Sequence, residues 1–168
     1  MQTKGSGMDD ILEILANDAR VSPDEIARMT GKKVADVKKA IKKYEDDGTI
    51  IKYKAVLDPD KARGETSWVR ALIEVSVVPQ KDVGFDTVAE RIYSFPEVTS
   101  CYLVSGTYDL LVVVEGETIH TVSNFVASKL SPMDGVRGTS THFLLKKYKE
   151  DGQVLKKNNN RKRLAISY

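Results

Sequence analysis

The sequence predicts an α+β fold in two parts, a helical N-terminal domain followed by a domain of strands and helices. Three observations support this prediction. Up to residue 47, apolar residues recur at steps of three and four, the spacing of amphipathic helices. From residue 67 onwards, short β-branched and aromatic runs alternate with helical patterns. Between the two parts, residues 55–66 become polar and rich in turn formers, which is typical of a hinge.

Residues 8–54 are expected to form the N-terminal domain, after a disordered stretch at residues 1–7. Its first helix is predicted over residues 9–17, where Ile11 and Leu15 begin and end an apolar stripe. Aspartates at the start of this segment favour a helix N-terminus, because their charge complements the helix dipole.

A second, short helix is predicted over residues 23–29. Ser22 has the features of an N-cap, with Pro23 at the first helical position and Glu25 in place to complete a capping box. Gly31 ends this helix, because glycine readily adopts the left-handed backbone that stops one.

A third helix follows at once, over residues 33–44, with its apolar residues on one side and lysines over most of the other. Two helices joined by a tight glycine turn indicate a helix-turn-helix, whose second helix enters the major groove of DNA. A cationic helix face suits a groove lined with phosphates. The predicted DNA-binding residues are Lys32, Lys33, Asp36, Lys38, Lys39, Lys42 and Lys43.

The segment after the third helix is predicted to form a strand over residues 49–56, because it is β-branched and aromatic. A strand in this position indicates a winged helix-turn-helix.

The second domain, residues 67–148, has the order β-α-β-β-α-β, which predicts a ferredoxin-like sheet with two helices on one face. The opposite face of the sheet is expected to be apolar, with contributions from Cys101, Leu103, Phe143 and Leu145. Because an apolar face needs a partner to cover it, a homodimer is predicted. The expected strands and helices, in chain order, are residues 67–78, 82–95, 98–105, 108–115, 118–130 and 136–148.

Charge is segregated along the chain, although the formal net charge is only +2. Residues 8–54 balance ten basic against ten acidic side chains, and residues 67–145 hold five against nine. The stretch from residue 146 holds eight basic and two acidic residues, and a basic tail is predicted over residues 149–168. This placement, more than the total, favours a nucleic-acid partner.

Several classes of protein are excluded or disfavoured. Cys101 is the single cysteine, so the chain forms no internal disulfide and no cysteine-based zinc site. No apolar run reaches membrane length and no signal-peptide core is present, so a cytoplasmic location without membrane contact is expected. No nucleophile, P-loop or dinucleotide motif occurs, and no metal site or cofactor is predicted.

Three stretches together resemble the Lrp/AsnC regulators, the feast/famine transcription factors of bacteria and archaea. These are D-A-R-V-S-P-D-E-I-A at residues 18–27, Y-E-D-D-G-T-I-I-K-Y-K-A-V-L-D-P at residues 44–59 and S-G-T-Y-D-L-L-V-V-V at residues 105–114. The resemblance covers about residues 8–148. It implies a transcriptional regulator that binds palindromic DNA as a dimer, or as a tetramer or octamer, and senses an amino acid or related metabolite.

The resemblance also implies where the effector binds. An aspartate at a turn suits an α-ammonium, while hydroxyls and backbone amides suit an α-carboxylate. The alternative is that Gly106 and Asp109 have a purely structural role and only shape the hairpin. The implied effector residues are Gly106, Thr107, Tyr108 and Asp109, with Thr139, Ser140 and Thr141 opposite.

The third helix departs from the family, because it contains no arginine and has Ala40 where an arginine is usual. Lysine reads guanine less well than arginine, so this helix is expected to contribute phosphate affinity more than base discrimination. Two other interpretations are open: an amino-acid sensor whose helix-turn-helix contacts only protein, and a ferredoxin-like enzyme. Neither a catalytic cluster nor a paired acid and base supports the enzyme.

Overall fold

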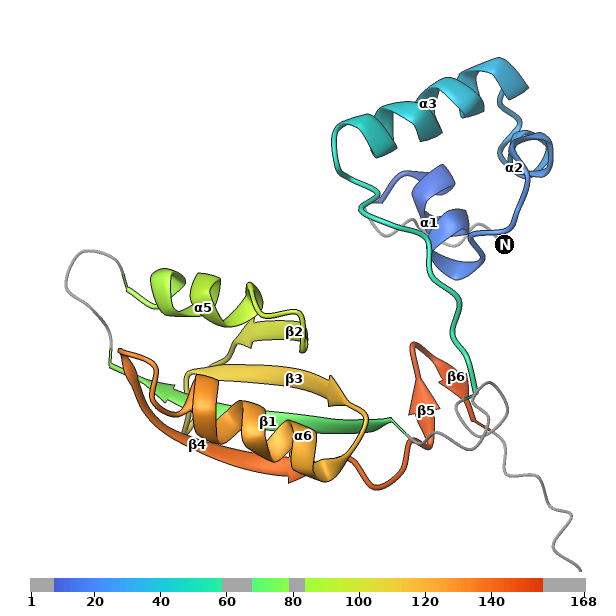
Figure 1. Ribbon diagram of the computed structural model, residues 1–168. Coiled ribbons are helices and arrows are strands. Elements are labelled where there is room, and N and C mark those ends of the chain that lie inside the picture. Colours follow the sequence, from blue (N-terminus) through green and yellow to red (C-terminus); the bar gives the residue numbers. More distant parts are fainter. Residues whose placement is uncertain (1–7, 59–67, 79–83, 156–168) are drawn as a thin grey trace, which may run out of the picture. The chain divides into compact units, whose positions relative to one another are not determined.

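The computed structural model describes residues 8–58, 68–78 and 84–155, and the chain divides after Val56 into two compact units. The N-terminal unit contains the three predicted helices (Figure 1). They are α1 (Asp10–Asn17), α2 (Pro23–Thr30) and α3 (Val34–Asp46). Their side chains meet in one small core, in which Ile26 and Val37 are fully buried beside Ile11, Leu15 and Ala27. The predicted apolar stripes are therefore the faces that pack.

Helix α2 has the predicted local chemistry at both of its ends. The Ser22 hydroxyl accepts a hydrogen bond from the Glu25 amide, and the Glu25 carboxylate accepts one from the Ser22 amide, which completes a capping box. Gly31 ends α2 with a φ of 70°, the left-handed region that glycine favours. The helix-turn-helix is thus fixed at both ends of α2 by residues that the sequence identifies.

The prediction of a strand over residues 49–56 is wrong for the single chain. The segment is extended, but it pairs with no strand in the described part of the chain. Ile51 is 91% exposed, and Tyr53 contacts α3 through a 2.8 Å hydrogen bond to Glu45. Its β-branched composition favours a strand only where a second strand completes the ladder.

The C-terminal unit has the predicted βαββαβ order. Its strands are β1 (Val69–Val77), β2 (Val98–Leu103), β3 (Leu110–Gly116) and β4 (Val136–Phe143). They form one antiparallel sheet in the order β2-β3-β1-β4. Helix α5 (Asp86–Tyr93) follows β1, and the start of its predicted range lies outside the described residues. Helix α6 (Ile119–Phe125) continues as a π-helical turn over Val126–Leu130.

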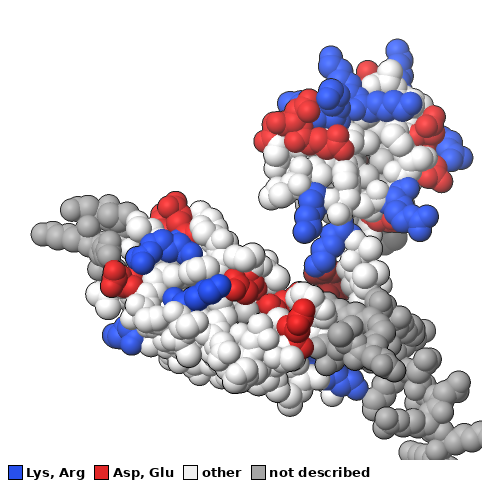
Figure 2. Space-filling view, in the orientation of Figure 1, with Lys and Arg blue, Asp and Glu red and all other residues white. Residues whose placement is uncertain are grey.

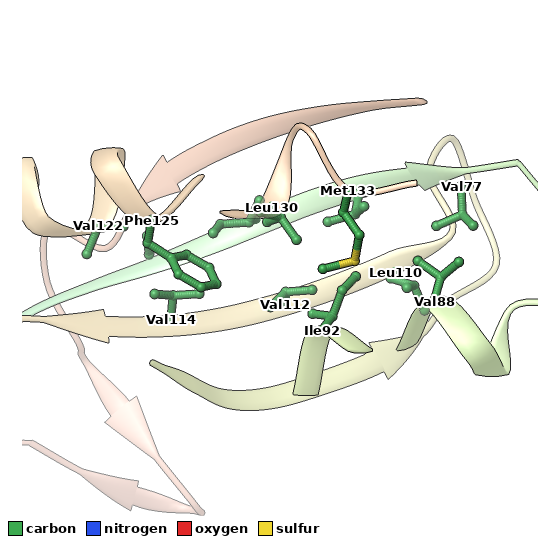
Figure 3. Packing of buried hydrophobic residues seen from close by; sticks show 13 residues of the cluster. Val77, Val88, Ile92, Leu110, Val112, Val114, Val122, Phe125, Leu130 and Met133 are labelled. Atoms are coloured by element: carbon green, nitrogen blue, oxygen red, sulfur yellow. The ribbon is translucent and has the colours of Figure 1, made fainter. Parts of the chain in front are cut away.

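Both helices cover one face of this sheet, as predicted. Figure 3 shows the core between the layers, where Val88 and Ile92 of α5 and Val122 and Phe125 of α6 point toward the sheet. The sheet contributes every second residue of β1 and β3, which gives an alternation of buried and half-buried positions. The opposite face therefore carries the other residues of each strand.

That opposite face is less apolar than predicted. Cys101 and Phe143 pack against the core on the helix side, because they pair with Val112 and Ala71, both of which are core residues. Leu72, Leu111 and Val113 form the apolar centre of the open face. Polar contacts lie on the same face: Arg70 forms an ion pair with Glu115, and His142 Nε2 lies 3.2 Å from a carboxylate oxygen of Glu74.

The end of the C-terminal unit also differs from the prediction. The last strand ends at Phe143 rather than at residue 148, and Leu145 is 95% exposed. A hairpin of β5 (Lys149–Glu150) and β6 (Gln153–Val154) follows, where the basic tail was expected to begin. Residues 156–168 of that tail, like residues 1–7 and most of the hinge, lie outside the described residues.

Candidate functional site

Helix α3 carries an exposed basic face. The lysines at positions 32, 33, 38, 39, 42 and 43 are all exposed, while Val37 behind them is fully buried. In Figure 2, basic atoms gather over α3 on the N-terminal unit. The predicted DNA-binding lysines therefore share one solvent-facing surface on a helix that its apolar stripe anchors to the core.

Most of these lysines form no ion pair in the described part of the chain. Lys32 lies 3.7 Å from Asp9, and Lys42 lies 3.5 Å from Asp46. Across residues 8–58, 68–78 and 84–155, no ion pair engages the remaining members of the face, which are Lys33, Lys38, Lys39 and Lys43. Lys33, Lys38 and Lys39 are therefore free to meet external phosphates, whereas the charge of Lys43 helps to lower the pKa of the nearby Asp47 carboxyl.

The C-terminal end of α3 is acidic instead. Glu45, Asp46 and Asp47 follow one another there, and Figure 2 shows acidic atoms over this end. The Thr49 hydroxyl and amide both donate to the Asp47 carboxylate, at 2.6 and 3.0 Å, and lower its pKa. Because this end stays negatively charged, the first two-thirds of α3 is the part suited to a phosphate-lined groove.

Asp9 fixes the start of α3 against α1. Its carboxylate caps α1 by accepting a 2.8 Å hydrogen bond from the Ile11 amide, and it also approaches Lys32. Burial, together with the nearby Asp9 carboxylate, raises the pKa of Tyr44 on the inner face of α3. One acidic residue thus links the first helix to both ends of the recognition helix.

The turn predicted to bind an effector lies between β2 and β3, and its aspartate is already engaged. Asp109 Oδ2 accepts a 2.8 Å hydrogen bond from the backbone amide of Val77. The backbone of Asp109 also bonds to Val75 and Val104. Asp109 therefore joins the turn to the end of β1, while Gly106 and Thr107 are exposed and Tyr108 is half-buried.

The pleat of β4 separates the three polar residues predicted opposite this turn. Thr139 pairs with Val75 and Thr141 with Ile73, so both side chains lie on the helix side, where Thr139 contacts the Ser131 hydroxyl at 3.0 Å. Ser140 pairs with Glu74 on the open face, 3.5 Å from His142. A single ligand on one chain would not reach all three hydroxyls.

Sequence reasoning missed a shallow groove between α5 and the π-helical turn. Arg91, Phe95, Lys129 and Met133 are among its lining residues. Glu97 pairs with Lys129 at 2.6 Å, which lowers the pKa of Glu97. Arg91 donates to the Asp134 carbonyl and forms no ion pair with a carboxylate among the described residues. No motif marks these positions, because they meet only through tertiary packing.

In the described part of the chain, no helix is long and apolar enough to cross a membrane. The described residues also contain no group of three or more His, Cys, Asp or Glu side chains that could hold a metal ion.

Two family models match the two units. The winged helix-turn-helix DNA-binding model matches residues 10–51, and the Lrp/AsnC ligand-binding domain model matches residues 70–154. The chain is 48% identical over 158 residues to the uncharacterized HTH-type transcriptional regulator YugG of Bacillus subtilis, covering 94% of this chain and 95% of that protein. It is 31% identical over 144 residues to the HTH-type transcriptional regulator FL11 of Pyrococcus furiosus, covering 86% and 91% of the two chains.

A solved structure gives the same result. The fold matches that of a Neisseria meningitidis transcriptional regulator in complex with L-Met, with a TM-score of 0.65, 27% identity, and 84% and 89% of the two chains covered. The resemblance first indicated by three short motifs thus extends to both domains and to their order. The chain belongs to the Lrp/AsnC family of transcriptional regulators.

Proposed function

We propose that this regulator binds double-stranded DNA through the basic face of α3, with residues 8–54 as the DNA-binding domain. The observation that supports this best is that Lys33, Lys38 and Lys39, at the start and on the exposed side of α3, form no ion pair with any described residue. Unpaired exposed ammonium groups release counterions from DNA when they contact phosphates, and this drives binding. The proposed contact residues are Lys32, Lys33, Asp36, Lys38, Lys39, Lys42 and Lys43.

The protein would act as a dimer, and a tetramer or octamer would consist of such dimers. The open sheet face has an apolar centre at Leu72, Leu111 and Val113, and a second copy of the same face would cover it. Two α3 helices related by a two-fold axis would read the two halves of a palindromic site. Because lysines dominate, the spacing of the half-sites would supply much of the specificity.

The C-terminal domain, residues 67–148, would sense an amino acid. The Neisseria relative was solved with L-Met, and the family model is a ligand-binding domain. The proposed effector residues remain Gly106, Thr107, Tyr108 and Asp109, with Thr139, Ser140 and Thr141. Because β4 splits the hydroxyls between two faces, a complete pocket would combine residues of neighbouring chains. The protein would work in the cytoplasm as a regulator, not as an enzyme.

The DNA proposal is tested by titrating the purified protein against its own promoter region at several salt concentrations. Lys39→Ala should weaken binding and lower the slope of log K against log salt by about 0.9 per protomer, because one phosphate contact is lost. Arg137→Ala, which removes an exposed cation on β4 outside the basic tail, serves as the control and should leave the slope unchanged. Equal slopes for both variants would contradict the assignment of α3.

The effector proposal is tested by a thermal-shift screen of the free protein against the amino acids. A ligand that binds only the folded state raises the melting temperature, and the stabilisation grows with the logarithm of 1 + [L]/Kd. The absence of any shift at millimolar concentrations of every amino acid would contradict amino-acid sensing.

A further inference from the structure

We propose that Asp36 is the specificity-determining residue of α3, and that its carboxylate accepts a hydrogen bond from the exocyclic amino group of cytosine in the major groove. This inference rests on the proposed DNA binding and adds a base to it. It assigns a sequence-reading role to the one acidic side chain within the basic stretch of the helix.

Asp36 occupies the third position of α3, which starts at Val34. Its side chain is exposed, as are those of Lys38 and Lys39 on the next turn. The N-terminal residues of a recognition helix are the ones that reach base edges. The acidic C-terminal end of α3, with Glu45, Asp46 and Asp47, is repelled by phosphates, which also favours entry of the N-terminal half.

Asp36 has no capping role, although it stands where one is common. In α2 the acid at the same helix position, Glu25, completes a capping box with Ser22, and these bonds lower the pKa of Glu25. In α3 the N-cap is Lys33, and no side chain caps the helix. The carboxylate of Asp36 is therefore not held by the helix end.

Asp36 also has no ion-pair role within the described residues. Lys32, one turn earlier, pairs with Asp9 at 3.7 Å, and Lys39, three residues later, forms no ion pair with any residue that the structure describes. The other carboxylate of α3 with a lysine four residues away, Asp46, does pair, with Lys42 at 3.5 Å. Asp36 therefore lies among lysines but forms an ion pair with none of them in the described part of the chain.

A carboxylate on a DNA-facing surface weakens binding, because phosphates repel it at any sequence. That penalty is offset only where the carboxylate meets a hydrogen-bond donor. In the major groove the donors are the amino groups of cytosine and adenine, and acidic side chains accept from cytosine N4. An asparagine at the same position would prefer adenine, to which it bonds with both its oxygen and its nitrogen.

The test is a binding selection from a library of random 30-base-pair duplexes, with sequencing of the bound DNA. The proteins compared are the wild type, Asp36→Asn and Asp46→Asn, each a full chain. Asp46→Asn makes the same chemical change on the same helix, about 15 Å away along its axis. The wild type should enrich a C·G pair at one position of each half-site, by about fivefold or more over other pairs.

Asp36→Asn should move that position to A·T, while Asp46→Asn keeps C·G. If Asp36→Asn and Asp46→Asn both select the wild-type sequence at every position, Asp36 reads no base and the inference is wrong. If the wild type itself enriches no sequence but binds all duplexes, the proposed sequence-specific function fails before the variants are compared. Melting temperatures within a few degrees of the wild type confirm that both variants are folded.

Discussion

Asp109 combines two possible roles in one carboxylate, and its hydrogen bond decides which substitution is informative. Oδ2 accepts the Val77 amide at 2.8 Å where β1 ends. We predict that Asp109→Ala lowers the free energy of unfolding by about 1–3 kcal/mol, because a half-buried amide loses its partner. Urea denaturation followed by circular dichroism measures this loss.

Asp109→Asn is the matched control, since it keeps an oxygen acceptor and removes only the charge. It should unfold within about 1 kcal/mol of the wild type. If an amino acid that stabilises the wild type no longer stabilises this variant, the charge of Asp109 binds the ligand. Full stability of Asp109→Ala would show that the bond to Val77 contributes nothing.

At this scale the sequence identified which residues are polar but not which way they point. The motif around Gly106 and Asp109 is visible in the sequence, whereas the bond from Val77 depends on the register of β1 against β3. The side chains of Ser140 and Thr139 lie on opposite faces of the sheet because side chains alternate along a strand, so this separation could have been predicted. The groove beside Lys129 could not, because its walls come from separate elements.

At the scale of elements, α2 depends on its capping box. We predict that Ser22→Ala lowers the stability of the N-terminal unit by about 1 kcal/mol, because the Glu25 amide loses its acceptor. Ser22→Thr, which keeps the hydroxyl, should cost less than half as much. Thermal unfolding of the two variants, followed at the helix signal, compares them. Equal losses would show that the hydroxyl is not what starts α2.

The β5–β6 hairpin is held to β1 through Glu150. Lys147 and Arg70 both contact its carboxylate, at 3.0 and 3.2 Å, and they lower its pKa, with Lys147 as the larger cause. A carboxyl whose pKa is lower in the folded state stabilises the fold above its unfolded pKa. That stabilisation is lost as the pH falls through the lower, folded pKa.

We therefore predict that Glu150→Gln lowers stability at pH 7 by no more than about 1 kcal/mol and makes no difference near pH 2. Glu117→Gln, at an exposed site without an ion pair in the described part of the chain, is the control and should change neither. Urea denaturation between pH 2 and pH 7 measures both. A loss for Glu150→Gln that stays constant with pH would contradict the charge-based explanation.

The elements that sequence predicted well are those whose signals are local. The helices of the N-terminal unit follow from spacing and caps, and Asp9 and Ser22 mark two of their starts. The strand over residues 49–56 failed because its propensity requires a partner strand. The hairpin at Lys149–Val154 has a local signal, the Asp151-Gly152 turn with φ of 44° and 78°, which the surrounding lysines obscured.

At the scale of the whole molecule, the proposed dimer depends on covering the open face of the sheet. Leu72 pairs directly with Val113, and both remain partly exposed although both stand at the centre of strands. We predict that Val113→Asp yields a folded monomer, because a carboxylate in the centre of a paired apolar face is desolvated without a partner. Light scattering after size-exclusion chromatography should give the mass of one chain. This is half the wild-type mass if the wild type is a dimer, and a smaller fraction if the wild type forms larger assemblies.

Ile119→Asp is the control, because Ile119 is an apolar residue on α6 that is 57% exposed and takes no part in the sheet. It should leave the mass unchanged. The monomeric Val113→Asp protein should also bind a palindromic duplex more weakly than the wild type, with the affinity of one α3 helix instead of two. If the Val113→Asp variant is folded and has the wild-type mass, the dimer contact lies on another surface. Two α3 helices related through that other surface would then bind half-sites with a different spacing.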